Sequence, residues 1–573
     1  MSGLPDIDIA MLILYLVGVT ALGLWPVRWI HNIGDFFMPR RFGKMMMITH
    51  AFGTGTAADQ AVVVASGTFR SGLSGIWYQW MWLFSTPFYW LIAPIMRRFR
   101  AITTADVYTL RYGNSVAILF VVVGIANLSV KMGLMLKGSG ALVDSCTGGL
   151  VNANWAIAIT TILFVIYGSA GGLSAAILTD FVQGILIVVF SFMVLPFVLH
   201  AVGGLEGVRQ TIQDPAMMSL VVPGEIGLFF LIMFALQALV GIVAQPFIMG
   251  VCAAGRTEMD GRVGFMVGNV VKRLCTIPWC LTGIAAVALY VQRGFDVSSI
   301  DPDNVYGDMA WRFLRPAMPG LLGIFLASLL ASIMSSCSAF MVSSSGLFTK
   351  NIYKPAVPNK SERHYVWVGR VTSVLVVAGG MAFAYWVPNV VKALKIWMSI
   401  APMMGIAFWL GLLWRRTTVA GAWAAALVGF GVWLLTTRPF FIDFAGGLPF
   451  AEKLRLVWNE AGRAPEIYEP WRISFYTVAA TLAAILVSLA TRPVAREKLD
   501  RFYALIRTPI QAGEKIVEPC TLPEGVTPPD RPMLLSAFGL EIPMPSRTSV
   551  IGFLAGWAAV AALIGGFVLI VTF

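Results

Sequence analysis

Long blocks of apolar residues, separated by short polar stretches, run along most of this 573-residue chain. A helix of about 20 apolar residues spans the hydrocarbon core of a bilayer, and backbone groups in lipid must be paired within the protein. The blocks predict transmembrane helices, because the strands of a membrane barrel would alternate in polarity over only about ten residues. The pattern predicts about fourteen spans, at residues 7–25, 44–67, 73–96, 115–143, 151–168, 177–201, 226–250, 263–290, 319–347, 365–387, 391–414, 417–436, 472–490 and 549–572.

The composition agrees with this pattern, since 58% of the residues are hydrophobic and only 12% are charged. The net charge is +12, which in a membrane protein reflects basic cytoplasmic loops rather than nucleic-acid binding. The six cysteines form no CxxC pair and mostly fall in apolar blocks. We interpret them as small packing residues rather than metal ligands or disulfides.

The loop charges predict the orientation of the chain. Lysine and arginine gather in alternate loops, as they do on the cytoplasmic side of membrane proteins, at Arg28, Arg40, Arg41, Lys44, Arg97, Arg98, Arg100, Arg111, Arg256, Arg262, Lys350, Lys354, Lys360, Arg363, Arg415 and Arg416. With fourteen spans, both termini are expected outside the cytoplasm. The N-terminal stretch has no positive n-region and no cleavage site, which indicates a retained first span rather than a signal peptide.

One predicted span contains a cluster of poor helix formers. Residues 53–56 read Gly-Thr-Gly-Thr, and Asp59 and Gln60 follow. Two glycines and two β-branched residues in one turn weaken a helix. An unwound stretch at membrane depth is tolerated where it lines a cavity, and its freed carbonyls can coordinate a cation. Close helix packing through small residues is the alternative interpretation.

Two other spans carry polar side chains in an apolar setting. Ser332, Ser335 and Ser336 stand at i, i+3 and i+4, which places three hydroxyls on one helix face. Oxygen ligands suit a hard cation such as sodium, although serine also serves interhelical packing. Asp180 is an acid near the inner end of its span. Such acids usually mark ion pathways, and a helix cap at the interface is the alternative.

Four segments resemble the sodium:solute symporter family, to which the sodium/galactose and sodium/proline symporters belong. GGLSAAILTDFVQ (171–183) resembles its fifth core helix, and SSCSAFMVSSSGLFTKNIY (335–353) resembles its eighth. YQWMW (78–82) resembles the second core helix, and GLLWRRTT (411–418) resembles the end of the tenth. The resemblance implies an all-α polytopic membrane protein with a leucine-transporter-type core of two inverted five-helix repeats, whose first and sixth core helices are broken.

On this resemblance the repeats would occupy 44–201 and 226–414. One extra helix at 1–30 would precede them, and two peripheral helices at 417–490 and a C-terminal helix at 549–573 would follow. Residues 492–548 are basic with an apolar stripe and then rich in proline. That pattern predicts a cytoplasmic amphipathic segment lying on the inner membrane surface.

The resemblance also implies a sodium site between the first and eighth core helices. Its ligands would be the carbonyls of Gly53, Thr56 and Ser332 and the hydroxyls of Ser335 and Ser336. Asp180 would lie on the path by which sodium leaves.

The substrate side departs from the sugar transporters of the family. Gln60 is retained, an acid of the second core helix becomes Gln79, and the position of an Asn in the sixth falls beside Gln245. A sugar would lose hydrogen-bond partners, so the pattern argues against one. We take these three residues, with Tyr78 and Lys272, as candidate substrate positions.

Basic residues are in surplus within the predicted spans: Lys131, Lys137, Lys272, Arg273, Lys392 and Lys395. Buried cations are costly and normally face a cavity or a counter-charge, which favours an anionic substrate such as a carboxylate. The alternative is that these side chains snorkel to the interface.

These observations predict a sodium-coupled symporter that imports a small organic anion by alternating access in the cell (inner) membrane. Sodium is the coupling ion, no other cofactor is expected, and lipid and the solute are the only partners implied. The alternatives are a sodium/amino acid symporter with Asp59 as the counter-charge, a proton-coupled carrier, and a membrane solute sensor. The four scattered histidines argue against an enzyme, and no oligomeric state follows from the sequence.

Overall fold

Helices make up nearly all of the regular structure in the computed structural model. It describes residues 4–572 apart from 223–225, 389–393, 395, 399, 401, 459–463, 512, 515 and 517. The N-terminal half contains α1 (Asp6–Leu24), α2 (Ile33–Phe37), α3 (Lys44–Gly55), α4 (Ala58–Ser71), α5 (Trp77–Trp80), α6 (Thr86–Arg98), α7 (Thr104–Arg111), α8 (Asn114–Cys146), α9 (Ala153–Met193), α10 (Leu195–Val202) and α11 (Gly204–Thr211).

The rest of the chain is built in the same way. It contains α12 (Leu228–Ile242), α13 (Ile248–Ala253), α14 (Glu258–Gln292), α15 (Val305–Ala317), α16 (Leu321–Phe348), α17 (Lys354–Ala356), α18 (Glu362–Trp386), α20 (Pro402–Leu413), α21 (Val419–Leu435), α22 (Pro439–Gly446), α23 (Ala451–Leu454), α24 (Glu469–Ala490), α25 (Arg496–Arg507) and α26 (Arg547–Thr572). Two small antiparallel pairs join β1 (Val457–Trp458) to β2 (Glu466–Ile467) and β3 (Met533–Leu535) to β4 (Ile542–Pro543).

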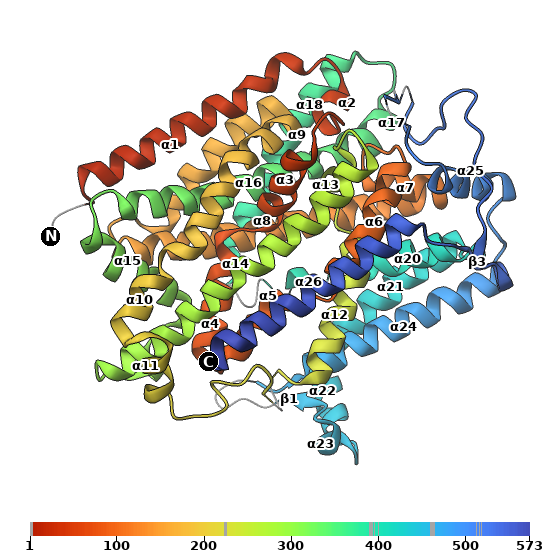
Figure 1. Ribbon diagram of the computed structural model, residues 1–573. Helices are drawn as coiled ribbons and strands as arrows, with labels where there is room; N and C mark the ends of the chain where they lie inside the picture. Colours follow the sequence, from red (N-terminus) through yellow and green to blue (C-terminus); the bar gives the residue numbers. More distant parts are fainter. Residues whose placement is uncertain are drawn as a thin grey trace.

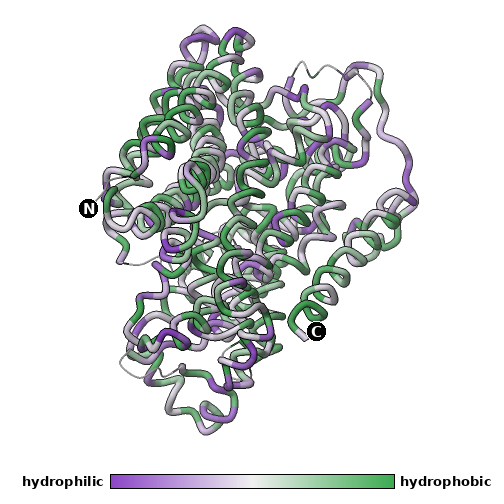
Figure 2. Tube along the Cα trace, turned by 60° about the vertical axis from the view of Figure 1, so that its left-hand side comes forward, coloured by the Kyte–Doolittle hydropathy of each residue, from purple (hydrophilic) through white to green (hydrophobic). Residues whose placement is uncertain are grey.

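The described helices fit a membrane protein. Nine of them are long and apolar enough to span a bilayer, or ten if the bent pair α21 and α22 forms one span. Leu14 of α1, Leu486 of α24 and Ile551 of α26 are all exposed, as expected of side chains that face lipid. Figure 2 shows hydrophobic residues along the helices and most hydrophilic residues in the loops around them. The predicted count of fourteen stays a prediction, since several predicted spans are interrupted or joined.

Two predicted spans, 151–168 and 177–201, are joined in α9. Gly172 interrupts this helix with φ 57° and ψ −150°, a conformation that favours glycine. Tyr167 donates to the carbonyl of Met334 at 3.1 Å, whereas Asp180 accepts from Ser335, the next residue of α16. In a straight helix, residues 167 and 180 would lie about 20 Å apart. The chain therefore turns back at Gly172 and crosses the bundle twice.

Two helices are broken within the bundle, as the resemblance implies. The first break separates α3 from α4, where Thr56 and Ala57 are extended. The second separates α12 from α13 at residues 243–247. Pro246 explains the second break, because it lacks an N–H and disfavours helical geometry at Gln245. Broken helices leave backbone carbonyls and N–H groups facing the middle of the bundle.

Figure 1 places both termini toward the end of the molecule that carries α10, α11 and α15. The helices α2, α7, α17 and α25 lie toward the opposite end, and the basic loops of the sequence are next to them. The two ends of the chain thus share one side of the bundle.

The segment after α24 folds against the protein. Leu499, Phe502, Tyr503 and Leu505 of α25 are buried, and the ring of Phe502 lies 5.3 Å from that of Phe99, just after α6. The apolar stripe of α25 therefore packs against the ends of α6 and α7, which provide an apolar surface that covers it. The location of residues 492–548 on the inner membrane surface stays a prediction.

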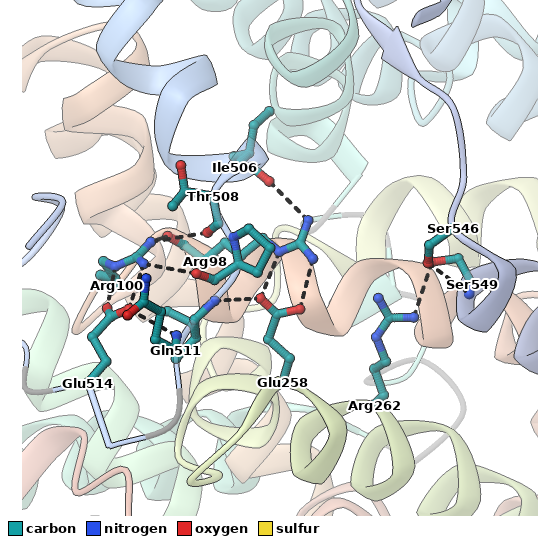
Figure 3. Close-up of polar contacts among 12 residues, drawn as sticks. Arg98, Arg100, Glu258, Arg262, Ile506, Thr508, Gln511, Glu514, Ser546 and Ser549 are labelled. Carbon is teal, nitrogen blue, oxygen red and sulfur yellow. Dashed lines mark hydrogen bonds and ion pairs between the residues drawn. The ribbon is translucent and has the colours of Figure 1, made fainter. Parts of the chain in front are cut away.

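Ion pairs hold the same segment in place (Figure 3). Arg98, at the end of α6, binds both oxygens of Glu258 at 2.8 Å and also donates to the carbonyl of Ile506. Arg100 binds Glu514 through two nitrogens at 2.6 and 2.9 Å. Burial opposes ionisation of the Glu514 carboxyl, but hydrogen bonds from Arg100 and from the backbone of Gln511 outweigh it and hold its pKa below the usual range.

Candidate functional site

The break between α3 and α4 lies against the serine face of α16. Ser336 donates its Oγ proton to the carbonyl of Gly53 at 2.8 Å, and Ser335 donates to Asp180. A side chain at position 53 would place its Cβ 2.6 Å from the Ser335 oxygen. Glycine at this position therefore allows α3 and α16 to approach closely enough for hydroxyl and carbonyl oxygens to meet.

The two remaining residues of the predicted cation site, Thr56 and Ser332, are also buried. The hydroxyl of Thr56 is buried without a hydrogen-bond partner, and its backbone N–H donates to the carbonyl of Gly53 at 3.2 Å. Ser332 lies one turn before Ser335 and Ser336, and its hydroxyl donates back to the carbonyl of Leu329. Direct hydrogen bonds link Gly53 with Ser336 and Thr56, while Ser332 shares the helix face of the other serines.

Asp180 has a partner that the sequence analysis missed. Its Oδ2 lies 2.6 Å from Nδ1 of His50, and Thr54 donates to the same oxygen at 3.5 Å. His50 and Thr54 are four residues apart on α3 and face each other at 3.1 Å. This i, i+4 relation was the available signal, but nothing in the sequence places Asp180 beside it. The carboxylate, hydroxyls and freed carbonyls form an oxygen-rich group suited to a hard cation.

A small cavity of about 50 Å³ lies on the other side of the same break. Four of the five predicted substrate residues line it: Gln60, Gln79, Gln245 and Lys272. Tyr78 does not line it, because its ring packs against Gly67, where a Cβ would lie 2.6 Å away. Ligand pockets usually measure several hundred Å³, so the cavity has to widen before a solute enters.

Three of the side chains that line this cavity are cationic: Lys131, Lys272 and Arg273. Lys272 donates to the carbonyl of Gly55, and Gln60 donates to the same oxygen at 2.7 Å. Lys131 pairs with Asp59 at 3.3 Å and lies 4.4 Å from the centre of the Trp397 ring. These cations are buried in the bundle, so snorkelling to the interface does not describe them.

The other basic residues of the predicted spans differ. Arg273 is buried and lines the cavity, whereas Lys137 is half-buried and does not. Lys392 and Lys395 lie outside the described residues. The pairing of Lys131 with Asp59 could not be predicted from sequence pattern, since the two residues are 72 positions apart.

Comparisons with known proteins agree with this geometry. The family model described as "Sodium:solute symporter family" matches residues 36–429. The sodium/pantothenate symporter of Escherichia coli (strain K12) is 24% identical over 474 residues, covering 78% of this chain and 93% of that protein. The high-affinity proline transporter PutP of Bacillus subtilis (strain 168) is 25% identical, over 74% of this chain and 90% of its own.

Two solved structures share the fold. The substrate-bound outward-open state of a Na⁺-coupled sialic acid symporter has a TM-score of 0.68 at 16% identity, covering 85% of this chain and 98% of that chain. The closed conformation of Mhp1, a nucleobase-cation-symport-1 family transporter, has a TM-score of 0.51 at 12% identity, covering 82% and 98%. The core therefore has the leucine-transporter-type fold.

The buried pair of Asp59 and Lys131 gives a stability prediction. Asp59→Asn leaves Lys131 as an uncompensated buried charge, and breaking such a pair typically costs about 3–5 kcal/mol. Thermal unfolding of the purified protein, followed by tryptophan fluorescence, should show a clearly lowered Tm. The double variant Asp59→Asn/Lys131→Met should recover most of the loss, because it removes both charges.

Asp530→Asn is the matched control, since Asp530 is exposed. An Asp59→Asn protein as stable as this control would contradict the pairing.

Proposed function

Because the chain belongs to the sodium:solute symporter family, we propose that it uses sodium entry to import a small organic anion. Sodium-coupled symport follows from the family, and no enzymatic activity is attributed to these transporters. The observation that carries the substrate class is the charge of the cavity wall. Lys131, Lys272 and Arg273 line the cavity, and Asp59 is the acid that pairs with one of them.

Sodium is proposed to bind where α3 breaks against α16. The carbonyls of Gly53, Thr56 and Ser332 and the hydroxyls of Ser335 and Ser336 would provide five neutral oxygens, and Asp180 would receive the ion as it leaves. The hydrogen bond from Ser336 to Gly53 supports this assignment. A cation that enters there would replace the hydroxyl proton of Ser336 as the partner of the Gly53 carbonyl oxygen.

The anion is proposed to bind beside the same break, near Gln60 and Lys272. A carboxylate would replace the carbonyl of Gly55 as the acceptor for Lys272, whose ammonium now donates to that carbonyl. Attraction between sodium and the anion is strong in a site from which water is excluded. Each ligand therefore favours binding of the other.

An amino acid is the second candidate, and one observation favours it. The Oδ1 atom of Asp59 is buried without a hydrogen-bond partner among the described residues, so it offers an unused acceptor for a substrate ammonium group. The relatives include pantothenate and proline transporters. Pantothenate is an organic anion and proline is a zwitterion, so both classes occur among the relatives.

We further propose that the protein lies in the inner membrane with both termini on the outer side. The basic loops lie at the opposite end of the bundle from the two termini, and basic loops stay in the cytoplasm.

The sodium assignment predicts weaker ion binding in two serine variants. Ser335→Ala and Ser336→Ala each remove one oxygen ligand, and each should raise the half-saturating sodium concentration about tenfold. This factor corresponds to the binding free energy of about one contact to a charged group. Binding of radioactive sodium to purified protein measures this. Ser344→Ala is the control, because Ser344 lies on the same helix and only donates to Phe340. Unchanged sodium affinity in both variants would refute the site.

The substrate assignment predicts which solutes stabilise the protein. In sodium buffer, carboxylates should raise the Tm more than amino acids or neutral sugars, because a ligand stabilises the state that binds it. Lys272→Met should abolish the response to carboxylates, whereas Lys360→Met, at an exposed position, should keep it. Best stabilisation by sugars, or an intact carboxylate response in Lys272→Met, would show that the substrate class is wrong.

The orientation predicts how single cysteines react. The six native cysteines are buried, so an impermeant thiol reagent should label few of them. In intact spheroplasts, cysteines introduced near either terminus should be labelled, whereas Asn359→Cys, in an exposed basic loop, should react only after permeabilisation. Protection of one terminus would mean that the number of spans is not even.

A further inference from the structure

Arg273 is a buried cation that has no acidic partner among the described residues. It follows Lys272 on α14, its exposed fraction is 1%, and it lines the same small cavity. Its Nε and Nη1 atoms have no hydrogen-bond partner in the part of the chain that the structure describes. None of the ion pairs between described residues includes it.

A buried guanidinium group without an acidic partner lowers the stability of the folded protein when it serves only packing. Buried polar groups are hydrogen-bonded in the great majority of cases, and an uncompensated buried charge costs several kcal/mol. Tyr89 is a polar neighbour of the guanidinium group, and the Trp82 ring lies 5.8 Å from its central carbon. A phenol and an aromatic face are both neutral, so they offset only part of that cost. The unpartnered N–H groups fit an acceptor that a bound solute would supply.

The charges on the cavity wall indicate how many negative charges that acceptor carries. Lys131 and Asp59 neutralise each other at 3.3 Å. Two positive charges then remain, on Lys272 and Arg273. A single carboxylate neutralises one of them and leaves the other buried.

The two cations also lie against different walls. Lys272 reaches the carbonyl of Gly55 at the broken helix, whereas Arg273 lies toward Trp82, which follows α5. Neighbouring residues of a helix project about 100° apart, so the two charges form two separate anchor points. The guanidinium fork matches the two oxygens of a carboxylate.

We infer that the substrate is a dicarboxylate, with one acid group held by Lys272 and the other by Arg273. This rests on the proposed function, since it narrows the anion class of the same site. Arg273 sets the preference for a second acid group, and Lys272 with the broken helix binds the first. Sodium adds its charge in the adjacent site, which further favours a substrate with two negative charges.

The test compares probes that differ by one charge at nearly constant shape. Binding of malonate, succinate, glutarate and adipate to the purified protein in sodium buffer is measured by calorimetry beside that of their half-amides. At least one dicarboxylate should bind about tenfold or more tighter than its half-amide, because a hydrogen-bonded charge pair is lost. In Arg273→Gln that ratio should fall to about one, whereas the half-amide should bind as before.

Two further variants keep the result interpretable. Arg293→Gln, at an exposed arginine directly after the C-terminal end of α14, should preserve the wild-type ratio. Arg273→Lys keeps the charge but loses the fork, and it should give an intermediate ratio if Arg273→Gln fails to fold.

Three outcomes would overturn the inference. Equal affinity for dicarboxylates and half-amides in the wild type would show that the protein does not recognise a second acid group, while the anion proposal would still stand. If Arg273→Gln still prefers the dicarboxylate over its half-amide to the same degree, Arg273 does not bind the second acid group. Tighter binding of glycerol phosphate than of every dicarboxylate would show that the substrate carries both negative charges on one phosphate group. Tightest binding of proline or glucose, in contrast, would refute the proposed function itself.

Discussion

Unpaired backbone groups cannot be left in the middle of a membrane protein, and this constraint organises the whole site. The chain breaks between α3 and α4 because glycine and threonine weaken the helix there. The freed carbonyl of Gly53 accepts from Ser336, and that of Gly55 accepts from Gln60 and Lys272. A serine face on one side and a buried lysine on the other are thus consequences of one break.

The same break explains how two ligands are coupled. Gly53 and Gly55 are two residues apart, yet the first carbonyl accepts from Ser336 of α16 and the second accepts from Lys272, which lines the cavity. An ion bound at Gly53 and an anion bound at Lys272 therefore act on one short piece of backbone. Coupling between sites requires such a shared element, whose state both ligands change. Opening of the cavity of about 50 Å³ has to involve the helices that meet at this point.

The sequence predicted the helical class, the break at residues 53–56 and the serine face, because each depends on local composition and periodicity. The second helix break was expected only from the family resemblance. Long-range partners were not predictable in this way. His50 meets Asp180 across 130 positions, and Arg100 meets Glu514 across 414. The surface that covers the apolar stripe of α25 was not predictable either, because the pattern is the same whether lipid or the end of α6 covers it. The direction of the Tyr78 ring depends on a close approach to Gly67, which local sequence does not indicate.

The central claim is that sodium bound at the broken helix drives accumulation of an anion. Uptake of labelled succinate into proteoliposomes tests it most directly, with an inward sodium gradient imposed in one sample and equal sodium on both sides in the other. The account predicts that succinate rises above its external concentration only while the sodium gradient lasts, and that a potassium gradient cannot replace it. Equal final uptake with and without the sodium gradient would contradict the account.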